Sequence, residues 1–192
     1  MFIELSGEVD RRFRDGDIHG AIADLETRLA QQPKDCFKSL LGSEFSNTPK
    51  SIAKSINQFA KWCRKQFELK AIYLEMNGFD INYDLWYFDS FGYNKYSKDP
   101  EDLDWLCEWR SEEWKQVTLT GLEAVQRDFS WYRENKIYDQ KEYTPAYDIA
   151  LLLVMAKFVH LIEAATKTPG FNVGIPIFAT AHDFDTLGRF EP

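Results

Sequence analysis

The stretch from Pro145 to about Thr166 constrains the fold more than any other part of the sequence, because it is apolar on nearly every side. Its longest unbroken apolar run is Ile149 to Ala156. A helix without a polar face is most stable when other elements surround it, so this segment is predicted to be the central core helix. A membrane-spanning helix needs about 20 apolar residues, and the run is much shorter. The sequence therefore predicts a soluble protein with no membrane association.

Helix starts are indicated by a capping residue followed by proline, because the proline lacks only an N–H group that the first helical turn leaves unbonded. The three pairs of this kind are Thr48-Pro49, Asp99-Pro100 and Thr144-Pro145. Together with an amphipathic pattern that ends before Pro33, they predict helices over residues 17–32, 49–69, 100–134 (interrupted near Gly121) and 145–166.

The apolar period changes to that of strands between residues 69 and 93. Residues 69–76 are apolar and β-branched, Asn77-Gly78 is a turn signal, and residues 84–93 alternate. A third strand is expected at 173–181, on a sheet edge because of Pro176. The sequence thus predicts an α+β fold, mainly helical with four to five helices and a small antiparallel sheet of about three strands. We expect a single globular domain spanning residues 1–192.

Composition excludes several classes of protein. The chain has 192 residues, of which 44% are hydrophobic and 16% aromatic, and this is incompatible with a disordered chain. Its net charge of −8 argues against nucleic-acid binding, which depends on neutralising phosphates. Cys36, Cys63 and Cys107 are too widely spaced for a disulfide framework or a zinc site, so they are predicted to be small apolar residues in a reducing compartment. Because the first residues contain no signal-peptide run, the predicted location is cytoplasmic.

Residues 75–113, named here the acidic aromatic segment, concentrate the charge of the chain. Against Lys95, Lys98 and Arg110, the segment holds eleven acids: Glu75, Asp80, Asp84, Asp89, Asp99, Glu101, Asp102, Asp104, Glu108, Glu112 and Glu113. Its net charge of −8 equals that of the whole chain. The same residues include ten aromatic rings, about half of which are expected in the core.

If residues 100 onward form a continuous helix, its acids make one stripe that faces away from the core, and Trp105 and Trp109 flank that stripe. Carboxylates speed the encounter with a basic protein, and large rings supply buried contact area. The predicted partner-binding residues are Asp80, Asp84, Asp104, Trp105, Glu108, Trp109 and Glu112. The alternative is a solvated helix face whose tryptophans pack beneath neighbouring loops.

A basic stripe is predicted on the helix that begins at Pro49. It consists of Lys50, Lys54, Lys61, Arg64 and Lys65. Such a stripe can bind phosphates or an acidic patch, including one on a second copy of the chain. The alternative is again a solvated face.

Catalytic motifs give a weaker signal. The chain has no nucleophile elbow, phosphate loop, dinucleotide-binding motif, zinc-protease motif or calcium loop. His182, Asp183 and Asp185 follow the third predicted strand and could form a metal site with Glu75 or Asp89. Because polar residues after a strand usually cap a turn, no metal or cofactor is predicted.

The favoured hypothesis is a non-enzymatic acidic module that binds a basic protein. In charge, size and aromatic content the chain resembles small acidic inhibitors and bacterial immunity proteins, which neutralise basic nuclease toxins. That resemblance rests on no sequence motif. The alternatives are a small metal-dependent hydrolase and a homo-oligomeric scaffold that pairs the basic stripe of one copy with the acidic segment of another.

Overall fold

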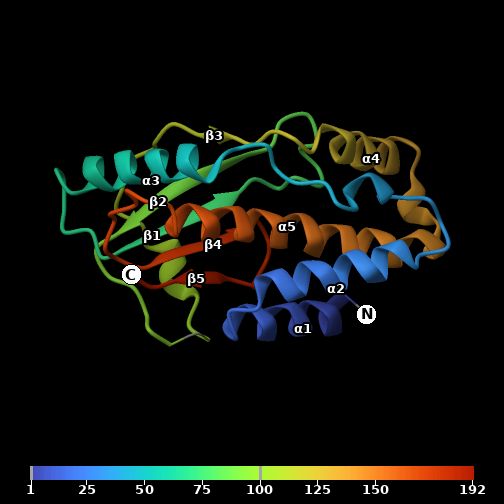
Figure 1. Cartoon of the computed structure of the whole chain (residues 1–192), viewed down its shortest axis with the longest axis horizontal. Helices are drawn as coiled ribbons and strands as arrows, with labels where there is room; N and C mark the ends of the chain where they lie inside the picture. Colours follow the sequence, from blue (N-terminus) through green and yellow to red (C-terminus); the bar gives the residue numbers. More distant parts are fainter. Residues whose placement is uncertain (1, 100) are drawn as a thin grey trace.

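A computed structural model describes residues 2–99 and 101–192, in which five α-helices accompany a five-stranded mixed sheet (Figure 1). The helices are α1 (Phe2–Arg14), α2 (Ile18–Ala30), α3 (Pro49–Cys63), α4 (Glu123–Glu134) and α5 (Thr144–Thr166). The strands are β1 (Ala71–Met76), β2 (Tyr87–Tyr93), β3 (Val117–Thr118), β4 (Ile177–Ala181) and β5 (Gly188–Phe190). The predicted α+β class with mainly helical content is confirmed.

The sheet is larger than predicted, and it is mixed rather than antiparallel. Its strand order is β3-β2-β1-β4-β5, with β1 and β4 parallel and the other neighbours antiparallel. The predicted third strand is therefore β4, and its place on an edge was wrong. Pro176 precedes the strand, so β4 can lie inside the sheet and bury all five of its residues. The short strands β3 and β5 were not predicted.

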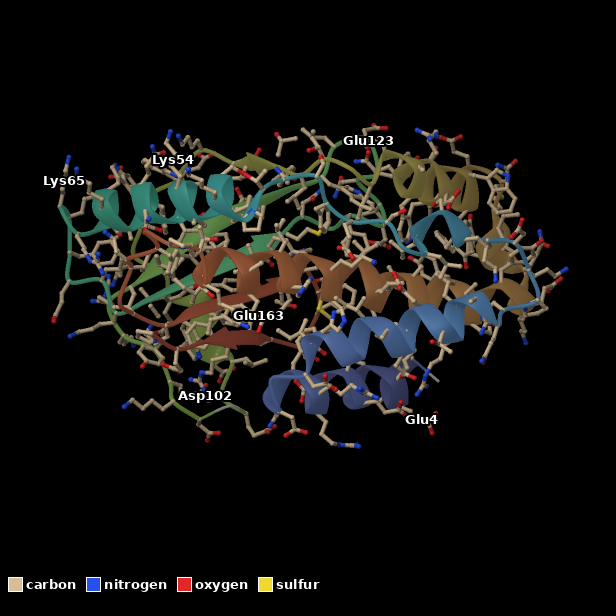
Figure 2. The ribbon with its side chains drawn as sticks, in the orientation of Figure 1. Glu4, Lys54, Lys65, Asp102, Glu123 and Glu163 are labelled. Carbon is tan, nitrogen blue, oxygen red and sulfur yellow. The ribbon has the colours of Figure 1, made fainter. Side chains whose placement is uncertain are left out.

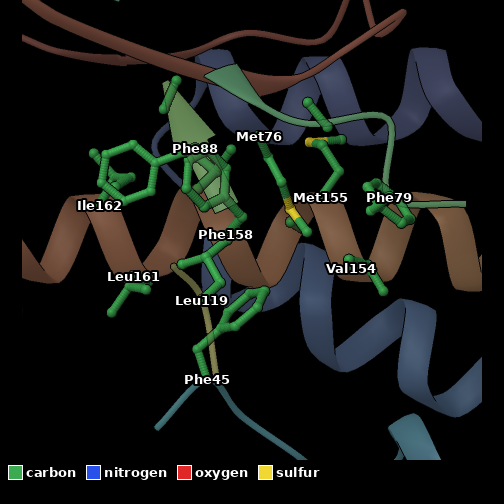
Figure 3. Packing of buried hydrophobic residues seen from close by; sticks show 14 of the residues in the cluster. Phe45, Met76, Phe79, Phe88, Leu119, Val154, Met155, Phe158, Leu161 and Ile162 are labelled. Carbon is green, nitrogen blue, oxygen red and sulfur yellow. The ribbon is translucent and has the colours of Figure 1, made fainter. Parts of the chain in front are cut away.

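Helix α5 forms the centre of the core, as predicted. It runs the length of the molecule, with α3 beside it on one side and α2 on the other (Figure 1). Phe158 of α5 packs against Phe88 of β2 with ring centroids 5.5 Å apart (Figure 3). By length and hydropathy alone α5 could cross a membrane, but 72% of its most apolar stretch is buried inside the protein. That burial is consistent with the core helix of a soluble protein.

One lysine is enclosed in this core. The Lys157 side chain is fully buried, and its ammonium group lies 2.8 Å from a carboxylate oxygen of Glu26 and 3.1 Å from one of Glu44. The Glu26 carboxylate also accepts the backbone N–H of Gly42 at 3.0 Å. This ionic cluster ties α2 and the loop before α3 to the central helix.

The other predicted helices differ in accuracy. Thr48 caps α3 as expected, through a bond from the N–H group of Ser51, and Asp17 caps α2 in the same way through Gly20. The expected cap by Thr144 was wrong, because Thr144 is the first residue inside α5 and no described side chain caps that helix. Helix α3 ends at Cys63, earlier than predicted, and α1 was not predicted.

The helix expected over 100–134 was wrong. A single 3₁₀ turn, η2 (Asp104–Cys107), is followed by extended chain that bonds to Gly92 of β2, and α4 begins only at Glu123. Residue 100, its expected start, lies outside the described residues.

Candidate partner-binding site

The acidic aromatic segment folds back over the sheet face that points away from α5. Trp105 of η2 is buried there, with its ring centroid 4.8 Å from that of Tyr93 and 4.9 Å from that of Phe178. The Tyr93 hydroxyl donates to the carbonyl of Leu106 at 2.8 Å and fixes the turn in place. Burial of the indole explains why the chain leaves the helical path, since a continuous helix would have kept Trp105 away from the sheet.

This arrangement leaves a cavity of about 560 Å³ between α1, residues 97–99 and 101–105, and β5, named here the acidic cavity. Side chains from α1, the acidic aromatic segment and the C-terminal strands supply its apolar lining. These residues are Ile3, Phe13, Leu103, Trp105, Phe178 and Leu187. A hollow of this size is within the range of small-molecule and side-chain binding pockets.

Carboxylates dominate the polar lining of the acidic cavity. They are Asp10, Asp99, Glu101, Asp102, Asp185 and Glu191. Among the described lining residues Arg14 and Arg189 are the only cations, so the six carboxylates leave a net charge of −4. Figure 2 shows Asp102 on the outer loop of the segment, pointing away from the core.

The two arginines tie the walls of the cavity together. Arg14 of α1 pairs with Asp10 at 2.8 Å and reaches across to Glu101. Arg189 of β5 lies over the ring of Phe178, 5.0 Å from its centroid, and donates to the carbonyls of Ser97 and Lys98 at 3.1 and 3.3 Å. These contacts hold the walls of the cavity in place, so the cavity is formed before any partner binds.

Three of the six carboxylates that line the acidic cavity have no cationic partner in the described part of the chain. Within residues 2–99 and 101–192, Asp99, Asp102 and Asp185 form no ion pair, whereas Asp10, Glu101 and Glu191 each have an arginine partner. Asp99 and Asp102 accept only backbone N–H groups of their own loop, at 3.0 and 3.2 Å. Their charge is therefore free to meet a positive group that enters the cavity.

The seven residues predicted from the sequence are not assembled into one site. Trp105 alone lines the acidic cavity, and it does so from a buried position. Asp80 is engaged inside the protein, with one oxygen 2.6 Å from the Arg133 guanidinium and 2.7 Å from the Tyr147 hydroxyl. It supports the packing of α4 against α5.

The remaining predicted residues lie on the surface outside the cavity. Asp84, Asp104 and Glu112 are exposed, and Glu108 pairs with Lys95. Trp109 is 50% exposed and packs on Phe91 at 5.3 Å between ring centroids. The predicted stripe depended on helical geometry that this segment does not have, so the stripe itself was wrong.

Sequence reasoning missed most of the acidic cavity. Asp99, Glu101 and Asp102 were counted in the acidic aromatic segment, and Glu101 also belonged to the predicted helical stripe, but none of the three was selected as a partner-binding residue. Asp10 and Glu191 come from α1 and the last residues, for which no tertiary position was predicted. Their negative charge was visible in the sequence, but nothing there indicated that these segments meet.

The residues of the alternative metal site come only partly together. His182 Nδ1 lies 3.0 Å from a Glu75 oxygen, and Asp89 is the register partner of Glu75 on β2. Asp185 belongs instead to the acidic cavity. Among the described residues, no group of three or more His, Cys, Asp or Glu side chains is arranged to hold a metal ion.

No family model, curated protein or solved structure matches this chain. The case for a function therefore depends on the geometry and charge of the sites described above.

Proposed function

We propose that this protein is a non-enzymatic binding module of inhibitor or immunity type, acting in the cytoplasm, whose acidic cavity takes a basic side chain of a protein partner. The observation that carries the proposal is the combination of an apolar, aromatic lining with a net charge of −4 in one preformed hollow. Aliphatic and aromatic surface accommodates the stem of a lysine or arginine, while carboxylates at the rim bind its charged end.

Arg189 supports this assignment from within the chain. Its guanidinium already lies over Phe178 and donates to two carbonyl groups at the cavity wall. A planar guanidinium stacks on rings and bonds to oxygens in this way more readily than an ammonium does. An arginine of the partner would meet the same kind of surface beside the unpaired Asp99, Asp102 and Asp185.

The wider charge distribution supports the encounter step. The acidic aromatic segment carries −8, so a basic protein is attracted before any contact forms. Exposed acids that have no role in the cavity, such as Glu112, act in this long-range attraction. Affinity comes from the cavity itself, where the arriving side chain is desolvated and surrounded.

The test uses a hexa-arginine peptide as the probe and follows its binding by calorimetry. Asp99→Lys together with Asp102→Lys is expected to weaken binding at least about tenfold, since each lost charged contact is worth about 1.5–3 kcal/mol. The matched control is Glu134→Lys with Asp139→Lys, which makes the same change in net charge on the exposed surface around α4. Equal losses in both variants would mean diffuse attraction and would refute a specific cavity.

A second variant fills the acidic cavity without changing its charge, and so tests whether the probe binds inside it. Gly7 lines the cavity from α1, and a Cβ added there meets nothing within 4 Å. Gly7→Trp is expected to fill the hollow and block the probe, whereas Gly7→Ala leaves binding unchanged and favours the helix. Undiminished binding in Gly7→Trp would show that the probe binds elsewhere.

A further inference from the structure

Helix α3 presents its basic residues along one side, as the sequence predicted. Lys50, Lys54 and Lys61 recur at intervals that bring them to the same face of the helix, and the C-cap residue Arg64 continues that face. Lys65, the fifth predicted member, lies beyond the end of α3 and is not in the lining described below. Figure 2 shows Lys54 on the outer surface of α3, on the opposite side of the molecule from Asp102. The stripe is thus well separated from the acidic cavity.

The structure adds a second wall that the sequence did not indicate. The loop after α5, residues 168–172, faces the stripe across an open hollow of about 590 Å³, named here the basic cavity. Asn57 of α3 anchors that loop, because its side chain donates to the carbonyl of Gly170 at 2.9 Å and accepts the N–H of Asn172 at 3.2 Å. Two short side chains on α3, Ala53 and Ala60, leave the space open.

The charge of the basic cavity is all of one sign. Its described lining includes the four cationic residues and no carboxylate. Across residues 2–99 and 101–192, no ion pair involves Lys50, Lys54 or Lys61, and Arg64 donates to the carbonyl of Val173. A net charge of +4 therefore lies in one hollow of a chain whose overall charge is −8.

We propose that the basic cavity is a binding site for a small ligand that carries two or three linked phosphate groups. Such a ligand has a charge close to that of the four cations with the sign reversed, and phosphate oxygens accept hydrogen bonds from both lysine and arginine. Asn57, Gln58 and Thr168 add neutral polar groups to the same lining. The volume accommodates a ligand of nucleotide size.

Shape favours this ligand over a second copy of the chain. The acidic and basic cavities are both hollow, so placing one against the other would leave both of them unfilled. A compact anion can instead enter between α3 and the loop and contact several cations at once. The predicted pairing of the basic stripe with an acidic segment is therefore an outcome that the experiment must exclude.

The experiment measures binding of inorganic tripolyphosphate to the full chain by isothermal titration calorimetry, without added metal ions. We expect saturable binding of one anion per chain, weakened at least about tenfold by Lys54→Gln with Lys61→Gln. The matched control, Lys136→Gln with Lys141→Gln, removes two exposed lysines that lie outside the basic cavity and is expected to leave affinity unchanged.

Two results would overturn the proposal. The first is no saturable binding to the unmodified chain, or equal losses in both double variants, since either result shows that no specific anion site exists. The second result is that the chain binds no tripolyphosphate but forms a dimer in sedimentation experiments, and that salt or the Lys54→Gln, Lys61→Gln substitutions dissociate this dimer. That result would assign the stripe to an interface between copies.

Discussion

The ionic cluster around Lys157 should respond very differently to the loss of its cation and to the loss of its anions. The ammonium group is fully buried, whereas the side chains of Glu26 and Glu44 are 29% and 56% exposed. Replacing Lys157 with methionine leaves two carboxylates that water can reach. Replacing both glutamates with glutamine leaves a cation that water cannot reach.

The expected magnitudes follow from this asymmetry. Removing the partners of a buried charge costs about 3–5 kcal/mol. We therefore expect the Glu26→Gln, Glu44→Gln variant to lose about 3–5 kcal/mol. Lys157→Met should lose only about 1 kcal/mol, because methionine fills much of the same space.

Urea unfolding followed by tryptophan fluorescence measures both variants. A Lys157→Met variant that loses as much stability as the double variant would refute the reasoning, because packing rather than the buried charge would then explain the cost.

The same cluster predicts an acid-sensitive stability in the unmodified protein. Burial raises the pKa of Glu26, but the hydrogen bonds from Lys157 and Gly42 outweigh it, and the pKa lies below its ordinary value. A lowered pKa in the folded state gives stability that is present above the unfolded pKa of about 4.3 and is lost as the pH falls through the folded value. Lys157→Met should flatten this acid limb of the stability profile, and an unchanged limb would assign it to other carboxylates.

Two further predictions concern side chains that respond to pH or to reagents. The hydrogen bond to Glu75 raises the pKa of His182, so this pairing stabilises the fold below about pH 6.5, and the stabilisation is lost as the pH rises through the pKa of the folded state. Glu75→Gln should lower the pKa of His182 in an NMR titration. An unchanged pKa would exclude the pairing. Burial raises the pKa of the Cys36 and Cys63 thiols to about 12, whereas Cys107 is exposed, so iodoacetamide should label the native protein at Cys107 alone. Equal labelling of all three cysteines would contradict this order of burial.

The elements that could be predicted from the sequence are those whose local signals agree with their tertiary environment. Thr48 caps α3, and α5 is buried on every side, so each matches its pattern of residues. The segment around Trp105 was mispredicted because its local signal and its tertiary environment disagree: its periodicity fits an amphipathic helix. Edge-to-face packing of the indole against Tyr93 and Phe178 overrides that local preference.

The candidate sites were less predictable than the fold. Lys54 and Lys61 share a helix, so their common face could be read from spacing alone, but the loop anchored by Asn57 could not. The acidic cavity combines α1 with segments that are far from it in the sequence, since Arg14 and Glu101 alone are 87 residues apart. Long-range contacts such as the pairing of Arg14 with Glu101 and the bonds from Arg189 to Ser97 and Lys98 bring those acids together, and no local pattern encodes contacts of that range.

The parallel pairing of β1 with β4 sets an order on folding. Ile72 and Ile177 are register partners, so about 100 residues must be in place before this ladder can close, which makes its closure entropically unfavourable and slow. Until then one side of the apolar strand β1 is an open edge of the kind that recruits strands from other chains. During synthesis the chain must therefore pass through a stage in which it is prone to aggregate, and a chain that ends before residue 177 would remain in it.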